Sequence, residues 1–189
     1  MTNHEDPGWW PSLRGSWWYT IGVGFVMLAR ARPGETNGLI VLRSVFVGLI
    51  AAPLLFLFAL SFIEPWDGGD EQWVPWVMIL IGIASLALIS SIRRRPLLTT
   101  SLEALAHLYG GLFFIGVGVA EGAAMWRFVG VFLGGSLWIS LIGLAFGLVG
   151  MWMIAPTRND IERRQREITA AGSGLSLLCA LTSVPLTGP

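Results

Sequence analysis

The sequence contains no lysine, one cysteine and two histidines among its 189 residues. A lone thiol, Cys179, forms neither an intrachain disulfide nor a multi-cysteine metal cluster. The absence of lysine excludes a Gly-Lys-Ser/Thr phosphate-binding loop, and the net charge of zero gives no support for nucleic-acid binding. His107 is the only histidine within an apolar stretch, which excludes a haem held between two histidines of one chain. We therefore expect no metal, no cofactor and no nucleic-acid partner.

Apolar residues are abundant and make up 54% of the chain. Four apolar stretches are long enough, as helices, to cross the hydrocarbon core of a bilayer, which is ~30 Å thick and needs ~20 residues. These stretches are residues 44–63, 74–92, 104–124 and 128–154. The pattern predicts an all-α integral membrane protein whose central domain, residues 44–154, is a bundle of four transmembrane helices.

The distribution of arginine predicts how these helices are oriented. Arginines lie before the first predicted span, between the second and third, and after the fourth, and Arg127 is the one exception. Because arginine is retained on the cytoplasmic side of a membrane, we expect both termini and the Arg93–Arg95 turn to be cytoplasmic. The expected location is the plasma membrane of a bacterium.

The N-terminal segment, residues 1–43, is expected to be cytoplasmic and to touch the membrane. The apolar stretch 17–29 ends in small residues like those of a signal-peptide cleavage site, but Glu5 and Asp6 make the preceding leader acidic, so we expect no cleaved signal. Aromatic rings with a polar tip favour the headgroup zone, which predicts an interfacial helix or a re-entrant piece over residues 9–29. The aromatic residues concerned are Trp9, Trp10, Trp17, Trp18 and Tyr19.

The C-terminal segment, residues 155–189, is expected to begin with a charged helix over 159–169, capped by Thr157. This helix either lies along the anionic leaflet, or contacts a partner, or is simply solvated. Residues 170–186 are predicted to form a loose tail, with a fifth span as the alternative. The acidic loop 64–73 is predicted to be a solvated turn, with a divalent-cation site as the alternative.

Small residues predict how the spans pack. In lipid, they let helix backbones approach closely. One face of the fourth predicted span carries five of them, at intervals of four, three, four and three residues: Ser136, Ser140, Gly143, Gly147 and Gly150. We expect this span to be the central packing helix, with Gly118 and Gly122 of the third span as further packing positions.

Polar residues at membrane depth are candidates for function, and the third predicted span carries a stripe of them. One face of that span holds Glu103, His107, Gly111, Phe114, Gly118 and Glu121. The stripe is a candidate ion or proton path, with Glu121 as the carrier and His107 and Glu103 near the inner mouth. Alternatively, Glu121 reaches the outer headgroups or pairs with Arg127, while the other two ionisable groups lie at the inner interface.

Residues 112–124, which include Glu121, resemble the carboxylate-bearing second helix of the proteolipid subunits of rotary ATP synthases. The resemblance implies a proton-carrying role for this glutamate. The chain departs from that family because Val74–Ile92 lacks closely spaced glycines and Glu121 lies far from the preceding loop. No family is assigned on this stretch.

No residues form a catalytic constellation, because Ser136 and Ser140 have glycine neighbours rather than a base. We expect a protein that is not an enzyme. The favoured function is a non-enzymatic accessory or scaffold component of a membrane assembly, in contact with lipids and either homo-oligomeric or bound to other membrane proteins. The alternative is a small ion- or proton-coupled channel or transporter that uses Glu121, and a membrane sensor ranks third.

Overall fold

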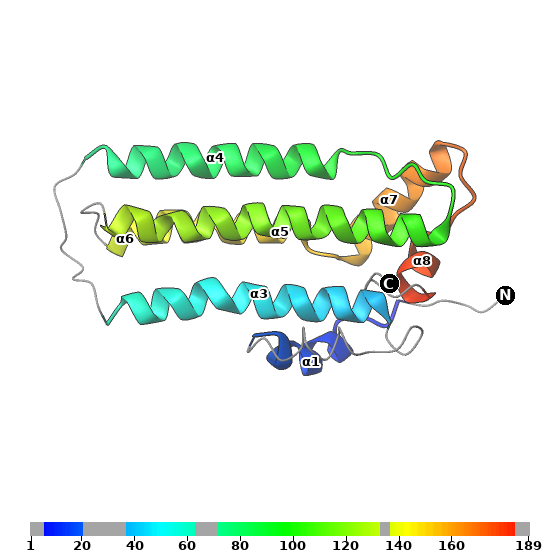
Figure 1. Cartoon of the computed structure of the whole chain (residues 1–189), viewed down its shortest axis with the longest axis horizontal. Helices are drawn as coiled ribbons and strands as arrows, with labels where there is room; N and C mark the ends of the chain where they lie inside the picture. The colour runs from blue at the N-terminus through cyan, green and yellow to red at the C-terminus, as the bar shows by residue number, and fades with distance from the viewer. Residues whose placement is uncertain (1–5, 21–36, 63–71, 133–136, 184–189) are drawn as a thin grey trace. The chain divides into compact units, whose positions relative to one another are not determined.

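The computed structural model describes residues 6–20, 37–62, 72–132 and 137–183 (Figure 1). Every regular element within these ranges is a helix, which confirms the predicted all-α class. The helices are α1 (Trp10–Thr20), α3 (Gly38–Leu60), α4 (Val74–Arg93), α5 (Leu102–Phe132), α6 (Leu137–Ile154), α7 (Arg158–Ala170) and α8 (Leu177–Ser183).

The chain divides into two compact units, and α3 and α5 contribute to both. Unit 1 comprises Met1–Leu49, Arg95–Phe113 and Ala155–Pro189, and unit 2 comprises Ile50–Arg94 and Phe114–Ile154. Unit 1 therefore contains α1, α7 and α8, whereas α4 and α6 lie in unit 2.

Three helices are long and apolar enough to cross a membrane. The qualifying segments are Gly38–Ala59 of α3, Val74–Arg93 of α4 and Leu102–Gly130 of α5. Helix α6 qualifies only as one half of a bent pair with α7. Large apolar side chains such as Phe58, Leu80 and Trp152 are exposed on these helices, as expected of surfaces that face lipid rather than water. These helices indicate a membrane protein.

The first of these helices begins six residues before the predicted start at Ser44. Asn37 ends the preceding segment, and its Oδ1 accepts hydrogen bonds from the backbone N–H groups of Leu39 (3.0 Å) and Ile40 (3.3 Å). This cap satisfies N–H groups that a helix start leaves open. The helix therefore includes Arg43, which the prediction placed before the span. Where the bilayer begins along α3 stays a prediction.

The third and fourth predicted spans also divide differently from the prediction. Helix α5 does not end at Ala124 but continues through Arg127 to Phe132, and the next described helix is α6, Leu137–Ile154. The predicted break between the third and fourth spans at residues 125–127 is therefore wrong, and residues 128–132 belong to α5. Where the chain enters and leaves the membrane stays a prediction. Residues 125–132 contain neither proline nor an aspartate or asparagine that would stop a helix, so a single arginine does not end it.

Helices α4 and α6 of unit 2 pack against each other in the same direction. Phe146 of α6 lies against Gly82 of α4, where a Cβ atom would overlap the phenyl ring. Further along both helices, Gly150 lies against Ile89, whose Cδ1 would be 2.9 Å from an added Cβ. Glycine at both positions therefore lets a large side chain of the neighbouring helix approach the backbone.

Helix α5 runs in the opposite direction to α6. Gly147 of α6 lies against Ala124, whereas Gly150, further along α6, lies against the earlier residue Ala120. An added Cβ at Gly147 would be 2.7 Å from Cβ of Ala124 and 3.2 Å from the carbonyl oxygen of Ala120. The α5 and α6 backbones thus approach as closely as small residues permit.

Four of the five exposed tryptophans in the described part of unit 2 gather at one end, and Trp152 lies near the other end of α6. Because α5 is antiparallel to α4 and α6, the start of α4, the end of α5 and the start of α6 lie together at this end. The tryptophans concerned are Trp73, Trp76, Trp126 and Trp138. Such a girdle is typical of the boundary between a bilayer and water.

The C-terminal segment of unit 1 forms two helices. Thr157 caps α7 as predicted, because its side-chain oxygen accepts the backbone N–H of Asp160 at 3.3 Å. Gly172, with a φ of +82°, ends the helix in the left-handed conformation that favours glycine.

The predicted loose tail instead contains α8. Gln165 holds this segment, because its Oε1 accepts the N–H of Leu177 (2.7 Å) and its Nε2 donates to the carbonyl of Leu175 (3.0 Å). The seven residues of α8 are too few to cross a bilayer. Its side chains Leu177, Ala180 and Leu181 are fully buried.

Most of the acidic loop 64–73 and residues 184–186 lie outside the described part of the chain.

Candidate functional site

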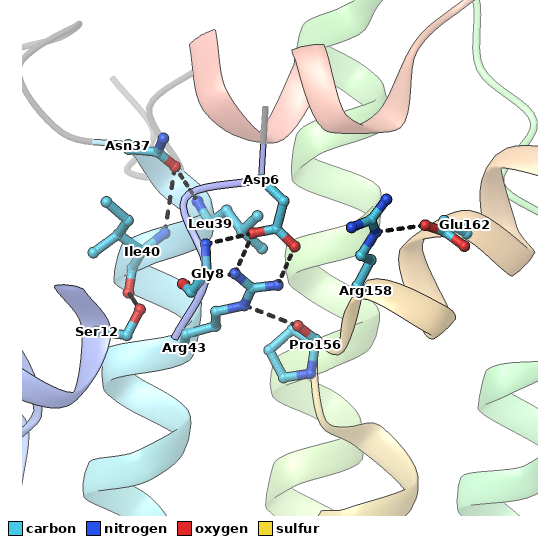
Figure 2. A network of polar contacts seen from close by, with 10 residues as sticks. All are labelled: Asp6, Gly8, Ser12, Asn37, Leu39, Ile40, Arg43, Pro156, Arg158 and Glu162. Carbon is cyan, nitrogen blue, oxygen red and sulfur yellow. Dashed lines mark hydrogen bonds and ion pairs between the residues drawn. The ribbon is translucent and has the colours of Figure 1, made fainter. Parts of the chain in front are cut away.

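The densest polar site in unit 1 is centred on Arg43 of α3, whose side chain is fully buried (Figure 2). Its two terminal nitrogens donate to the two carboxylate oxygens of Asp6, at 2.5 and 2.8 Å. Nη1 also donates to the carbonyl of Gly8 at 2.9 Å, and Nε donates to the carbonyl of Pro156 at 3.1 Å. One guanidinium therefore connects the N-terminal segment, α3 and the connection between α6 and α7.

The local sequence explains how Asp6 reaches this position. Its Oδ1 accepts the backbone N–H of Gly8 at 2.9 Å, and Gly8 has a φ of +73°, so the chain turns tightly between them. The ring of Trp9 then stacks on the guanidinium, 5.0 Å from the carbon at its centre. Aspartate and glycine at this spacing, followed by an aromatic residue, thus form a binding site for one arginine.

Helix α1 is fixed to the first turns of α3 by serines. The hydroxyl of Ser12, a fully buried residue, donates to the carbonyl of Ile40 at 3.2 Å, and the hydroxyl of Ser44 donates to the carbonyl of Ser12 at 3.0 Å. The rings of Trp9 and Phe46 lie 6.0 Å apart next to these bonds. The inner face of α1 is therefore anchored on α3.

The ion pair predicts an acid-sensitive N-terminal segment. The hydrogen bonds from Arg43 hold the pKa of Asp6 below its usual value of 3.8, the Gly8 N–H adds to this lowering, and partial burial opposes it. The stabilisation is therefore present above pH 3.8 and is lost as the pH falls through the lower pKa of the folded state. We expect α1 to resist pepsin at pH 3.8 and to become susceptible at lower pH.

The control for this prediction is Asp6→Asn, which removes the titrating group. Pepsin should cleave within α1 of this variant at similar rates across the whole acidic range. A wild-type segment that is cleaved equally fast above and below pH 3.8 would contradict the role of the pair.

A second cluster joins α7 to α5 in unit 1. Asp160 accepts hydrogen bonds from Arg164 Nε at 3.2 Å and from Arg163 Nη2 at 2.8 Å, and the hydroxyl of Tyr109 lies 3.5 Å from the same carboxylate. The Arg164 guanidinium also stacks on the Tyr109 ring, at 5.5 Å. Asp160, Arg164 and Tyr109 are all buried, so this cluster attaches the inner face of α7.

Most of the remaining charges of α7 are paired along the helix. Arg158 donates to Glu162 at 2.7 Å, and Arg163 lies 3.5 Å from Glu167. Because the basic groups have acidic neighbours at helical spacing, α7 offers less free positive charge to a lipid surface than its arginine content implies. Lipid binding by α7 stays a prediction.

The residues of the predicted ion or proton path differ in exposure. In unit 1, Glu103 is exposed and lies 4.0 Å from the half-exposed His107. In unit 2, Glu121 is half-buried. Among the described residues, no three His, Cys, Asp or Glu side chains are placed to hold a metal ion.

The predicted packing residues have two different surroundings. Ser140, Gly143, Gly147 and Gly150 of α6 are buried, and Ser136 falls in the part of the chain left undescribed. Gly118 and Gly122 of α5 face open space, since no described atom lies within 4 Å of an added Cβ at either position.

Sequence reasoning missed the seam on α5 that packs against α6. Gly116 lies against Ile154, and Ala120 and Ala124 lie against the glycines of α6. The spacing of four residues between these small side chains was a signal that could have identified them. It was overlooked because Gly118 and Gly122 show the same spacing.

The described residues thus form an all-helical protein with three helices able to cross a membrane and a buried polar site centred on Arg43. No protein-family model, curated protein or solved structure matches the chain.

Proposed function

We propose that this protein is a non-enzymatic, multi-pass component of a membrane assembly, and that it binds a transmembrane helix of another chain through the outward face of α5. The observation that carries this proposal is the open space over Gly118 and Gly122 on a helix able to cross a membrane. Helices associate in lipid where small residues let their backbones approach. The bound helix belongs to a second copy or to another membrane protein.

Comparison of the two small-residue seams of α5 supports this role. The seam of Gly116, Ala120 and Ala124 is occupied by α6. The second seam, Gly118 and Gly122, has the same spacing of four but no described neighbour over it.

We further propose four membrane crossings, with α6 as the fourth, in a bacterial plasma membrane with both termini in the cytoplasm. The arginines that precede α3, link α4 to α5 and follow α6 support this orientation. The tryptophan girdle of unit 2 then marks the outer membrane surface, and α1 lies at the inner one.

The test is to place isoleucine at Gly118 and at Gly122. Each variant should keep its helical content and thermal stability, because the added atoms enter open space. Association should weaken by about tenfold or more, because the added side chain separates the two backbones. Size and mass of the particles extracted from native membranes into lipid nanodiscs measure the association.

Ala87→Ile is the matched control, since Ala87 is an exposed small residue on α4, outside the proposed contact. This variant should associate like the wild type. Assemblies that survive both glycine substitutions, or a wild type that is always a lone 20.6 kDa protomer, would refute the proposal.

A second candidate function is a small ion- or proton-coupled channel or transporter. The half-buried position of Glu121 within a candidate span favours it. An ionisable group costs free energy inside a membrane, and such groups are therefore rare and often mark ion or proton pathways. In that case Glu121→Gln should abolish flux in proteoliposomes and leave expression unchanged. Flux that is absent from the wild type, or unchanged in the variant, would remove this candidate.

A further inference from the structure

The outward face of α1, formed by Trp10, Leu13 and Arg14, is exposed and has a composition that suits one kind of partner. Its inner face is fixed to Ile40 and Ser44, which belong to the first turns of a helix able to cross a membrane. These turns enter the bilayer through its interfacial zone, so α1 lies at the depth of the lipid headgroups. This inference rests on the proposed membrane insertion of α3, but not on association through α5.

The composition of this face fits a phospholipid leaflet. Trp10 is 65% exposed and Leu13 is 48% exposed, although both are large and apolar. Arg14 is also exposed, and its guanidinium carbon lies 5.2 Å from the centre of the Trp10 ring. Helix α1 contains no acidic residue, so nothing on the helix itself competes for the charge of Arg14.

We infer that α1 is a lipid-binding helix, whose Trp10 and Leu13 enter the interfacial zone of the inner leaflet while Arg14 binds the phosphate of an anionic phospholipid. Indole rings favour the boundary between headgroups and acyl chains. A guanidinium binds phosphate oxygens through parallel hydrogen bonds. The stack of Arg14 on Trp10 holds the guanidinium beside the ring, at the level where phosphates lie. Since Ser12, Ser44 and Trp9 hold the opposite face, binding requires no movement of α1.

The first experiment measures the depth of Leu13. The variant Leu13→Cys is made in a Cys179→Ser background, and its single cysteine is labelled with an environment-sensitive fluorophore. The labelled full chain is then reconstituted in vesicles of phosphatidylcholine and phosphatidylglycerol. Lipids spin-labelled near the headgroup should quench it strongly, and aqueous iodide weakly. Quenching by iodide alone places the face in water, and quenching by neither places it under protein, and either result overturns the inference.

Two control positions separate this inference from membrane insertion itself. Leu80 of α4 is 68% exposed and lies within a candidate span. A fluorophore on Leu80→Cys should be quenched by lipids labelled deep in the acyl chain. Asn159→Cys is exposed on α7 and should be quenched by iodide. If Leu80 is not reached by lipid quenchers, the membrane insertion on which the inference rests has failed. If Leu80 is reached and Leu13 is not, only the lipid-binding role of α1 has failed.

The second experiment tests the choice of anionic lipid. Spin-labelled phosphatidylglycerol should quench the Leu13 label more strongly than spin-labelled phosphatidylcholine at equal mole fraction. Arg14→Gln should lower this preference about fivefold, the effect expected of one basic residue at a membrane surface. Arg166→Gln, which alters an exposed arginine of α7, should leave the preference unchanged. An unchanged preference in Arg14→Gln would overturn the phosphate contact.

Discussion

Replacing Asp6 with alanine is expected to destabilise the protein by about 3–5 kcal/mol, since the substitution leaves the buried Arg43 guanidinium without its counter-charge. The guanidinium would keep its bonds to the carbonyl groups of Gly8 and Pro156, but carbonyl groups do not neutralise a charge. Denaturant unfolding in detergent micelles, followed by circular dichroism, measures the effect.

The double variant Asp6→Ala with Arg43→Met tests whether the loss comes from the unpaired charge. A buried ion pair and an apolar replacement of similar volume often have similar stability, so the double variant should recover most of what Asp6→Ala loses. Arg14→Ala, which removes an exposed arginine of the same region, should change stability by less than about 1 kcal/mol. If Asp6→Ala alone were as stable as the wild type, the pair would not hold unit 1 together.

Replacing Gly147 with isoleucine is expected to destabilise unit 2 by about 1–3 kcal/mol or more. An added Cβ would be 3.2 Å from the carbonyl oxygen of Ala120 and 3.3 Å from Cα of Ala124. These are backbone atoms that cannot rotate away, so α5 and α6 must separate. The melting temperature of the purified protein should fall clearly, and the fluorescence of tryptophans in unit 2 should change with it.

Gly118→Ile is the matched control, since it makes the same change on α5 where an added side chain meets open space. The two variants should therefore differ in what they lose: Gly147→Ile should lose folding stability, and Gly118→Ile should lose association. Equal melting temperatures for Gly147→Ile and the wild type would contradict the close approach of α5 and α6.

Helices with clear boundaries in the sequence were predicted well. The span predicted at 74–92 differs from α4 by one residue, because prolines or arginines mark both of its ends. The charged helix after Pro156 was predicted for the same reason, since Thr157 is a strong capping residue. Local signals suffice where a capping residue or a helix breaker coincides with a change in hydropathy.

Long-range pairing explains what the sequence did not reveal. Asp6 and Arg43 are 37 residues apart, and no local pattern connects them, so Arg43 was placed outside the helix that contains it. Arg127 was similarly taken as a loop residue, although one charge does not interrupt a helix. Among the polar candidates, the shared face of Glu103, His107 and Glu121 followed from helical spacing, but which face of α5 packs inward depends on α6.

The orientation of the chain in the membrane is tested most directly by labelling two single cysteines, one expected on each side of the membrane. Single cysteines at Thr100, in the connection between α4 and α5, and at Phe62, just beyond the end of α3, are both exposed and leave all the arginines in place. With Cys179 replaced by serine, intact cells are treated with a membrane-impermeant maleimide. We predict that the cysteine at 62 is labelled from outside, and that the cysteine at 100 is labelled only after the cells are lysed. Labelling of position 100 in intact cells would contradict the proposed orientation.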